Sequence, residues 1–229
     1  MSLRVQLSGM KVAIGMPLYG RIPARTALML AMTGHLCGKM GIQFEPIIEV
    51  GGIVDVTRDG VIDAFLKSDN EKLFWIDSDI VWSTDHFAKF LALSTKVDIV
   101  GATYPYKKDL PKTVYCVNVD EGVSNNELGL LPVKGMGLGF TLMNRNVIEA
   151  VVKGKPRFKN RLNNREMAKV FRVDILDGDL RTEDMAFFHD LADLGFQVWL
   201  DPTIDLGHIG EKEWQGNFSS TLIRKDNEH

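Results

Sequence analysis

Two aspartates close a stretch of four bulky apolar residues in the first half of the chain. The run 73–76 reads Leu-Phe-Trp-Ile and is followed by Asp77, Ser78 and Asp79. Such a run is typical of a strand buried on both faces of a parallel sheet, and ligands bind beyond the carboxyl ends of these strands. Because side chains alternate along a strand, we expect Asp77 and Asp79 on the same side. Paired carboxylates there can bind a hard divalent cation that holds a diphosphate, although a turn or a helix cap is the alternative interpretation.

A second pair of acids, Glu183 and Asp184, follows Thr182 at the start of an expected helix. Acids in the first turn of a helix interact favourably with the helix dipole, which is one explanation of this pair. The other explanation is chemical, because a carboxylate at the rim of a site can accept a proton as a general base. Spacing alone leaves both explanations open.

His208 lies in the segment Gly207-His208-Ile209-Gly210, after the last expected strand. The neighbouring glycines predict a loop in which the imidazole has little local packing. A neutral imidazole is a common ligand of divalent transition metals, and a plain surface histidine is the other interpretation. The remaining histidines are less suited to ligation, because three fall in expected helices and one is terminal: His35, His86, His189 and His229.

Gly135, Gly137 and Gly139 alternate with other residues just before an expected strand at 140–143. A dinucleotide-binding fingerprint must instead follow a strand and open a helix, so this segment does not predict a nicotinamide or flavin site. Alternating glycines either let the backbone approach a bound substrate closely or form a tight turn. The sequence contains no P-loop and no serine or cysteine nucleophile motif.

The first hundred residues alternate between strand and helix patterns. This alternation implies parallel pairing and an α/β fold, with a mixed, mainly parallel sheet flanked by helices. The expected strands are 11–16, 43–50, 73–76 and 97–102, and the expected helices are 24–37, 58–67 with Thr57 as its cap, and 85–93.

The remainder of the chain is less regular, but it contains no internal repeat and no domain linker. We therefore expect one domain over 1–229, with a nucleotide-binding part at about 10–105, an acceptor and catalytic part at about 106–210, and a tail at 211–229. The expected elements are a strand at 113–119, a turn-rich stretch at 120–129, a strand at 140–143, a helix at 144–152, a loop or lid at 154–169, a helix at 183–194 capped by Thr182, and a last strand at 196–200.

Composition excludes some classes of function. Twenty-seven Lys and Arg against 30 Asp and Glu give a net charge of -3, whereas a nucleic-acid-binding surface requires a basic excess. Cys37 and Cys116 form no C-x-x-C pattern and are expected to be buried thiols in a reducing compartment. The sequence has no apolar segment long enough to span a bilayer and no signal-peptide pattern in 1–10. We expect a cytoplasmic protein, with peripheral attachment to a membrane as the alternative.

In order along the chain, these features resemble the glycosyltransferases of the GT-A fold, particularly their family 2-like group. The resemblance extends from Val12 to about His208, and its motifs are weak singly but specific in this order. It implies a single GT-A-like, Rossmann-like domain. The matching segments are Gly15-Met16-Pro17, Thr57-Arg58-Asp59, Asp77-Ser78-Asp79, Gly101-Ala102-Thr103-Tyr104-Pro105, Gly137 to Phe140, Glu183-Asp184 and Gly207-His208.

The resemblance implies a donor site at the end of the first strand. Pro17, Leu18 and Tyr19 would line the nucleotide base and ribose, with Arg58 contacting base or phosphate. Asp59 departs from the family pattern, in which many members carry Asn at this position, and this puts its donor contact in question.

The same resemblance implies a metal centre. Asp77 and Ser78 would lie towards the ribose, and Asp79 would ligate Mn²⁺ or Mg²⁺ together with Asp77 and His208. Lys107 or Lys108 would add positive charge near the diphosphate, although exposed lysines explain them equally well.

The implied activity is transfer of a sugar from a UDP- or GDP-sugar to a hydroxyl of a glycan, lipid or protein acceptor. Asp184, or its neighbour Glu183, matches the catalytic base of inverting members. Gly137, Gly139 and Tyr104 are expected to contact the acceptor or the sugar.

Two other functions remain open from the sequence. A sugar-1-phosphate nucleotidyltransferase also uses acidic metal ligands, but the segment 17–21 is poorer in glycine than the loop such enzymes carry after their first strand. A non-catalytic nucleotide- or carbohydrate-binding module is disfavoured by intact acids at both candidate sites. The sequence does not indicate the oligomeric state.

Overall fold

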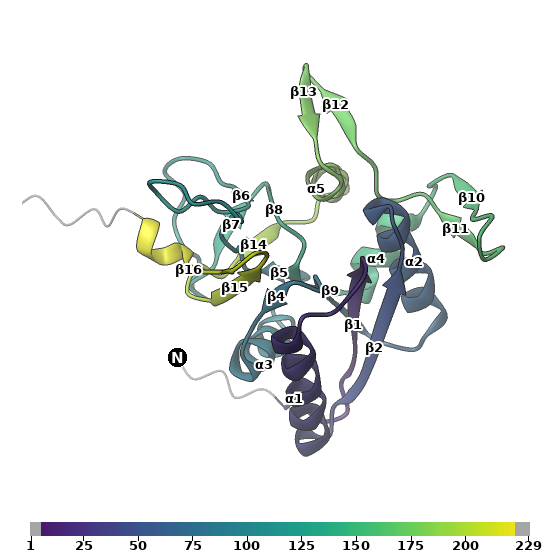
Figure 1. The fold of residues 1–229 in the computed structure, drawn as a ribbon, viewed down its shortest axis with the longest axis horizontal. Helices are drawn as coiled ribbons and strands as arrows, with labels where there is room; N and C mark the ends of the chain where they lie inside the picture. The colour runs from purple at the N-terminus through teal and green to yellow at the C-terminus, as the bar shows by residue number, and fades with distance from the viewer. Residues whose placement is uncertain (1–5, 223–229) are drawn as a thin grey trace, which may run out of the picture.

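A seven-stranded sheet runs through the centre of the protein, with helices on both of its faces (Figure 1). The computed structural model describes residues 6–222. Strands β9 and β7 run against the other five, which are mutually parallel, so the predicted mainly parallel α/β architecture is confirmed. The order across the sheet is β2 (Gln43–Val50), β1 (Lys11–Leu18), β3 (Lys72–Ile76), β9 (Phe140–Asn144), β5 (Ile99–Gly101), β14 (Val198–Leu200) and β7 (Leu131–Val133).

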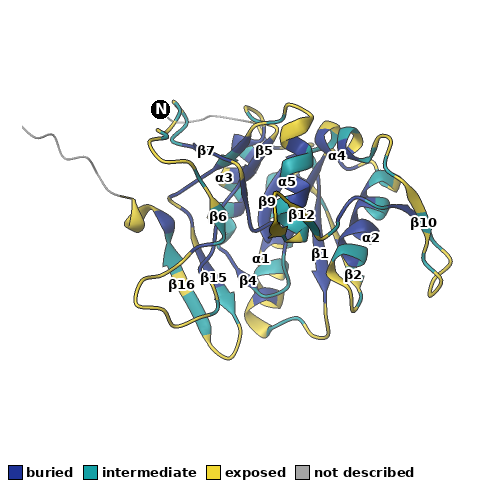
Figure 2. Ribbon diagram, turned by 90° about the horizontal axis from the view of Figure 1, so that it is seen from above, coloured by how far each residue is buried: buried dark blue, intermediate teal, exposed yellow. Residues whose placement is uncertain are grey.

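The two faces of the sheet have separate cores, and all five residues of β3 are buried between them. Phe74 stacks on Phe87 of α3, with ring centroids 5.1 Å apart, whereas Trp75 faces the other core and meets Phe171 at 5.6 Å. Figure 2 shows this buried centre in dark blue. The helices of the first core are α1 (Ala24–Met40) and α3 (Thr84–Leu93), and those of the second are α2 (Val54–Lys67), α4 (Arg145–Val152) and α5 (Glu183–Asp193).

Helix α2 begins one turn earlier than predicted. Thr57 lies inside the helix, and its hydroxyl donates to the Ile53 carbonyl at 2.9 Å, so its predicted role as the cap is wrong. Thr182 does occupy the cap position of α5, although its side chain makes no capping hydrogen bond. Helix α1 continues past its predicted end to Met40, where Gly41 stops it with a positive φ of 67°.

In the middle of the chain one strand is shorter than predicted, and one strand is present that was not predicted. The predicted strand at 113–119 is reduced to β6 (Val117–Asn118), which pairs with β8 (Gly135–Met136). Strand β7 was not predicted; it contains Pro132, which an edge strand tolerates.

Strand β14 is not the last strand, which corrects the prediction for the end of the chain. It is followed by β15 (Asp205–Ile209) and β16 (Glu213–Asn217), which form a small sheet with β4 (Ile80–Val81). His208 therefore lies in a strand rather than a loop. Residues 211–222 of the predicted tail include β16 and a short 3-10 helix (Phe218–Thr221), while 223–229 and with them His229 lie outside the described residues.

Segment 154–169 is a hairpin rather than the predicted loop or lid. It pairs β10 (Arg157–Lys159) with β11 (Glu166–Ala168), and Arg165 anchors it to Glu49 and Asp63 at 2.6 and 2.8 Å. A second hairpin, β12 (Asp174–Leu176) with β13 (Asp179–Arg181), was not predicted. None of the helices within residues 6–222 combines the length and apolar character needed to cross a bilayer.

Asp59 holds the chain that leads into the second hairpin. Its carboxylate is 1% exposed and accepts the backbone N–H groups of Val170 and Phe171 at 2.9 and 3.0 Å. Lys169 donates to its other oxygen at 3.1 Å. Asp59 is thus held by contacts inside the protein, because its carboxylate accepts both N–H groups and also pairs with a lysine.

Removing this carboxylate will destabilise the fold. We expect Asp59→Ala to lower the free energy of unfolding by about 2 to 4 kcal/mol, because two buried N–H donors lose their acceptor. Asp55→Ala is the matched control, since Asp55 on the same helix contacts only Lys169 in this cluster and should cost below about 1 kcal/mol. Urea unfolding of both variants measures the difference, and equal losses would contradict the assignment.

Candidate functional site

Asp77, Ser78 and Asp79 form a turn between β3 and β4 rather than an extension of the strand. The Asp77 N–H donates to the Gly139 carbonyl at 3.0 Å, and the Ile80 N–H closes the turn on the Asp77 carbonyl at 3.1 Å. The two carboxylates have different partners within the protein but line the same cleft. The prediction of a common location is met, although a turn rather than strand alternation produces it.

Arg58 is a buried bridge between the two pairs of acids. Its side chain is 4% exposed, with Nη1 3.0 Å from Asp77 Oδ1 and Nε 3.5 Å from Glu183 Oε1. The guanidinium carbon also lies 5.8 and 5.9 Å from the ring centres of Trp75 and Phe171. Burial lowers the pKa of Arg58, but the two carboxylates outweigh burial and hold the pKa above its usual value. Arg58 therefore stays charged while it fixes the positions of both acids.

Asp79 is paired with a lysine and a histidine. Lys107 donates to its Oδ2, and His208 Nε2 lies 3.7 Å from the same oxygen. Burial favours the protonated acid, but the neighbouring His208 and Lys107 outweigh burial and bring the pKa of Asp79 to about 2. Asp79 is thus an anion at any physiological pH. Of the two candidate lysines, Lys107 reaches the acids and Lys108 is exposed.

The His208 ring is oriented by the backbone. Its Nδ1 lies 2.8 Å from the Pro105 carbonyl, a contact that requires a proton on Nδ1, and Nε2 faces Asp79. The Tyr104 ring packs edge-on against the imidazole with centroids 4.8 Å apart. The structure therefore brings together residues 79 and 208, which are far apart in the sequence.

The first cleft, here called the Asp77 cleft, has a volume of about 400 Å³. Pro17, Leu18 and Tyr19 at the end of β1 form one wall, and Ser78 lies in the wall with the acids. Tyr19 is 81% exposed, so its ring faces solvent at this cleft. The residues predicted to bind a nucleotide therefore do converge on one cleft.

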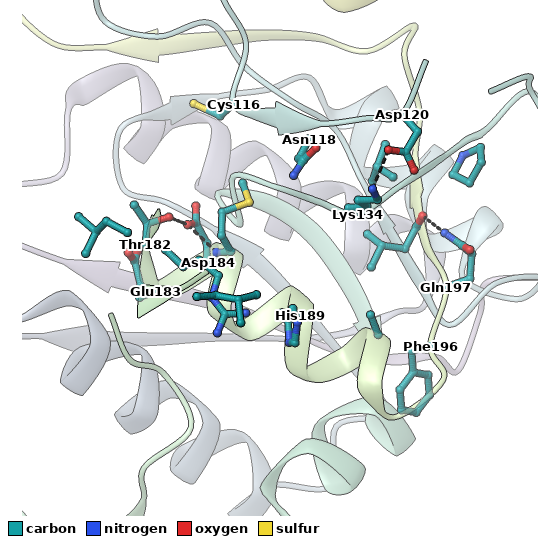
Figure 3. Close-up of a pocket in the computed structure, with 18 of the residues that line it drawn as sticks. Cys116, Asn118, Asp120, Lys134, Thr182, Glu183, Asp184, His189, Phe196 and Gln197 are labelled. Carbon is teal, nitrogen blue, oxygen red and sulfur yellow. Dashed lines mark hydrogen bonds and ion pairs between the residues drawn. The ribbon is translucent and has the colours of Figure 1, made fainter. Parts of the chain in front are cut away.

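A second and larger hollow, here called the Glu183 cavity, has a volume of about 960 Å³. Glu183 and Asp184 lie near one end of it, as Figure 3 shows. Burial raises the pKa of Glu183, and this outweighs the opposing effect of Arg58. Asp184 accepts hydrogen bonds from the Thr182 hydroxyl and from the Met185 N–H, both on Oδ1, so its Oδ2 is the oxygen available to a ligand.

The alternating glycines approach residues of the protein itself. A Cβ on Gly139 would lie 2.7 Å from Asp77 Oδ2 and 2.9 Å from the Tyr104 hydroxyl, and a Cβ on Gly137 would lie 2.3 Å from that hydroxyl. Tyr104 is 5% exposed, and burial raises the pKa of its hydroxyl well above the usual value. Gly139 therefore packs against Asp77 and Tyr104, and Gly137 packs against Tyr104. The predicted contact of these three residues with acceptor or sugar stays a prediction.

The three predicted metal ligands do not form one compact group. Asp79 and His208 are neighbours, whereas Asp77 is held by Arg58. Within residues 6–222, the group of three whose ligand atoms lie within 4.8 Å of one another is His189, Asp190 and Asp193. Asp190 in that group already accepts hydrogen bonds from Arg172 and Lys155, and these side chains balance its charge without a metal ion.

Sequence reasoning missed the hairpin that borders the Glu183 cavity. Leu176 and Leu180 line the cavity from β12 and β13. The segment Ile175-Leu176-Asp177-Gly178-Asp179-Leu180 carries a detectable signal, because Asp-Gly within an apolar stretch is a strong indication of a two-residue hairpin turn. Both central residues have the positive φ this turn requires, 52° and 88°.

Comparison with known proteins identifies the fold but no family. No family model matches the chain, and no curated protein matches it. A197 from STIV has a similar structure, with a TM-score of 0.56 at 18% identity over 96% of this chain and 100% of that chain. That likeness shows the fold alone.

Two further solved structures are less similar. A glycosyltransferase involved in the glycosylation of the major capsid of PBCV-1 has a TM-score of 0.36 at 12% identity, over 61% of this chain and 63% of that chain. UDP-glucose pyrophosphorylase complexed with UDP-glucose has a TM-score of 0.44 at 11% identity, over 93% and 94%. At these scores neither bears on the function of this protein.

The bridge made by Arg58 can be tested through stability. We expect Arg58→Met to lower the free energy of unfolding by about 2 to 4 kcal/mol, because two partly buried carboxylates lose their counter-charge. Combining it with Asp77→Asn and Glu183→Gln should recover part of this loss, since the acids then carry no charge. Urea unfolding of the single and combined variants measures the coupling, and additive losses would show that Arg58 acts on neither acid.

Proposed function

We propose that this protein is a glycosyltransferase that moves a sugar from a nucleoside-diphosphate sugar to an acceptor hydroxyl. The proposal rests on one observation: the Asp77 cleft and the Glu183 cavity are connected by the ion pair between Arg58 and Glu183. Arg58 lines the Asp77 cleft and contacts Glu183, which lines the Glu183 cavity. A group-transfer enzyme requires such an arrangement, because two substrates must meet with their reacting atoms oriented.

The Asp77 cleft is the proposed donor site. Its volume of about 400 Å³ is within the usual range for small-molecule sites. The exposed ring of Tyr19 offers a nucleobase a stacking surface, and the backbone at Pro17 and Leu18 borders the same space. Ser78 adds a hydroxyl beside the acids, which suits a ribose.

Asp79 and His208 fit a divalent cation, and Asp77 does not in its present contacts. With the Nδ1 proton directed at the Pro105 carbonyl, the lone pair of His208 Nε2 faces Asp79 Oδ2 at 3.7 Å. A divalent cation near both atoms would be bound by both and would displace the Lys107 ammonium from that oxygen. We propose that these two residues hold Mn²⁺ or Mg²⁺. When bound, such an ion stabilises negative charge on a leaving diphosphate as a Lewis acid.

The chain's own residues carry the remaining steps. Asp184 Oδ2 is the proposed base that removes the proton from the acceptor hydroxyl as that oxygen attacks the anomeric carbon. Glu183 remains in its contact with Arg58 and keeps the first turn of α5 in place. Lys107, whose ammonium already lies at Asp79, adds positive charge where the diphosphate leaves.

Nucleotide binding tests the donor site. We expect the chain to bind UDP or GDP more tightly with Mn²⁺ than without it, and Asp79→Ala to abolish that difference, because the ion loses its carboxylate. Asp109→Ala is the control, since Asp109 is exposed, is paired with Lys212 and does not line the cleft. Calorimetric titration gives both affinities, and an Asp79→Ala variant that keeps its Mn²⁺ response would refute the ligand role.

Turnover tests the reaction. A panel of UDP- and GDP-sugars with Mn²⁺ should release the nucleoside diphosphate, and Asp184→Asn should slow release by roughly 10²- to 10⁴-fold with donor affinity unchanged. Asp193→Asn at the exposed end of the same helix is the control. Near-normal turnover by Asp184→Asn would remove it as the base, and pyrophosphate exchange in place of release would indicate a nucleotidyltransferase.

Lys107 and a divalent ion compete for the same oxygen of Asp79. We therefore expect Lys107→Met to raise Mn²⁺ affinity by up to about fivefold, in line with the strength of a partly exposed ion pair. Lys108→Met, which removes an equal charge one residue away, should leave it unchanged. Electron paramagnetic resonance of free Mn²⁺ measures the affinity of each variant. Weaker Mn²⁺ binding by Lys107→Met would contradict the competition between Lys107 and the ion for Asp79.

A further inference from the structure

We propose that the acceptor is an uncharged hydroxyl compound with an apolar portion, and that the β12–β13 hairpin contacts that portion. This inference rests on the proposed function only in calling the ligand an acceptor. The binding site itself follows from the shape, lining and charge pairing of the Glu183 cavity and of the hairpin beside it.

The Glu183 cavity is large enough for such a compound and is mainly apolar inside. Its volume of about 960 Å³ is at the upper end of small-molecule sites. In Figure 3, Glu183 and Asp184 lie at one end and Lys134, Asp120 and Gln197 at the other. Between and around these ends the wall is formed by apolar side chains, among them Val123, Pro132, Val133, Met185, Ala192 and Phe196.

The cations of the cavity wall already have partners within the protein. Lys134 Nζ lies 2.7 Å from Asp120 Oδ1, and Arg181 donates to both oxygens of Asp174 at 2.8 and 2.9 Å. Gln197 donates to the Val198 carbonyl at 2.8 Å. Arg181 Nη1 is buried and has no hydrogen-bond partner within residues 6–222, and the carboxylates that line the cavity would repel an anion. The charge pattern therefore favours a neutral ligand.

The β12–β13 hairpin projects from the body of the protein (Figure 1), and several of its apolar side chains are exposed. Val173, Ile175 and Leu180 are 55%, 71% and 71% exposed, and Leu176 is 38% exposed. Ile175 and Leu180 are directly opposite each other in the pairing of the two strands, so they share one face. Contiguous exposed apolar side chains on a soluble domain are typical of a binding surface.

The hairpin is continuous with the catalytic end of the cavity. Leu176 and Leu180 themselves line the cavity, and Leu180 precedes Glu183 by three residues. The ion pairs of Asp174 with Arg172 and Arg181 hold the base of the hairpin, so it forms a fixed wall. A ligand whose hydroxyl meets Asp184 would therefore place an attached apolar group against these leucines.

The tip of the hairpin argues against an anionic membrane as the partner. The acidic residues Asp177 and Asp179 are exposed on either side of Gly178. Anionic lipid head groups would repel them. The apolar side chains are thus suited to a ligand that enters the cavity.

Binding of neutral alkyl glucosides to the full chain tests the inference without requiring turnover. Calorimetry with butyl, hexyl and octyl β-glucoside, each below its micelle concentration, should show a gain in affinity of roughly three- to fourfold for each added methylene. Leu176→Ser combined with Leu180→Ser should flatten this dependence, and both positions are exposed enough to tolerate serine. Leu162→Ser is the matched control, because Leu162 is 96% exposed on the other hairpin.

Each outcome decides one claim. Affinity that does not depend on chain length, or a dependence that the double variant retains, overturns the apolar site. A double variant that instead changes only self-association, measured by sedimentation, shows that the hairpin face covers another copy of the chain and also overturns it. Length-dependent binding without nucleoside diphosphate release from any sugar donor leaves the site standing and refutes the proposed function. Release of the nucleoside diphosphate with a polar sugar acceptor, together with glucoside affinities that do not depend on alkyl chain length, supports the proposed function and overturns the apolar site.

Discussion

A buried guanidinium between two carboxylates holds this site together. Removing Arg58, Asp77 and Glu183 from water is costly, and the cost is offset only if their geometry stays close to ideal. The side chain of Arg58 is 4% exposed and meets one acid at 3.0 Å and the other at 3.5 Å, so neither acid can move far without leaving a charge uncompensated. The distance between the two hollows is therefore set by this ion bridge.

The elements around Arg58 keep it in that position. The neighbouring residue on α2, Asp59, binds the backbone of Val170 and Phe171, and thereby holds the Phe171 ring beside the guanidinium. Phe171 stacks in turn on Phe187 of α5 with ring centroids 4.6 Å apart. One turn of α2 thus orients both the cation and the helix that carries Glu183 and Asp184, which links core packing directly to the site.

Charge is distributed unevenly across this arrangement. Lys107, His208 and Arg58 are gathered around Asp77 and Asp79, where a diphosphate would bring negative charge. On the other side, Asp184 keeps a free oxygen, and the cations of the cavity wall are paired with acids of the protein. A transfer reaction needs this polarity, since the leaving group gains negative charge while the acceptor oxygen loses a proton.

The sequence alone indicated the fold class and the residues with chemistry, because both depend on local pattern. The apolar run before Asp77 predicted the buried central strand, and alternating strand and helix patterns predicted the mainly parallel sheet. Local pattern also placed Glu183 and Asp184 in the first turn of a helix.

The local sequence pattern did not indicate which residues each of these side chains would contact. His208 was assigned to a loop because glycines flank it, whereas Gly207 lies where a Cβ would collide with the Glu213 carboxylate between paired strands. Arg58 was predicted to contact a nucleotide, which stays a prediction, but its ion pairs with Asp77 and Glu183, which are distant in the chain, could not be read from the pattern. Such pairings are set by which segments the sheet and helices bring side by side, and only the tertiary structure decides them.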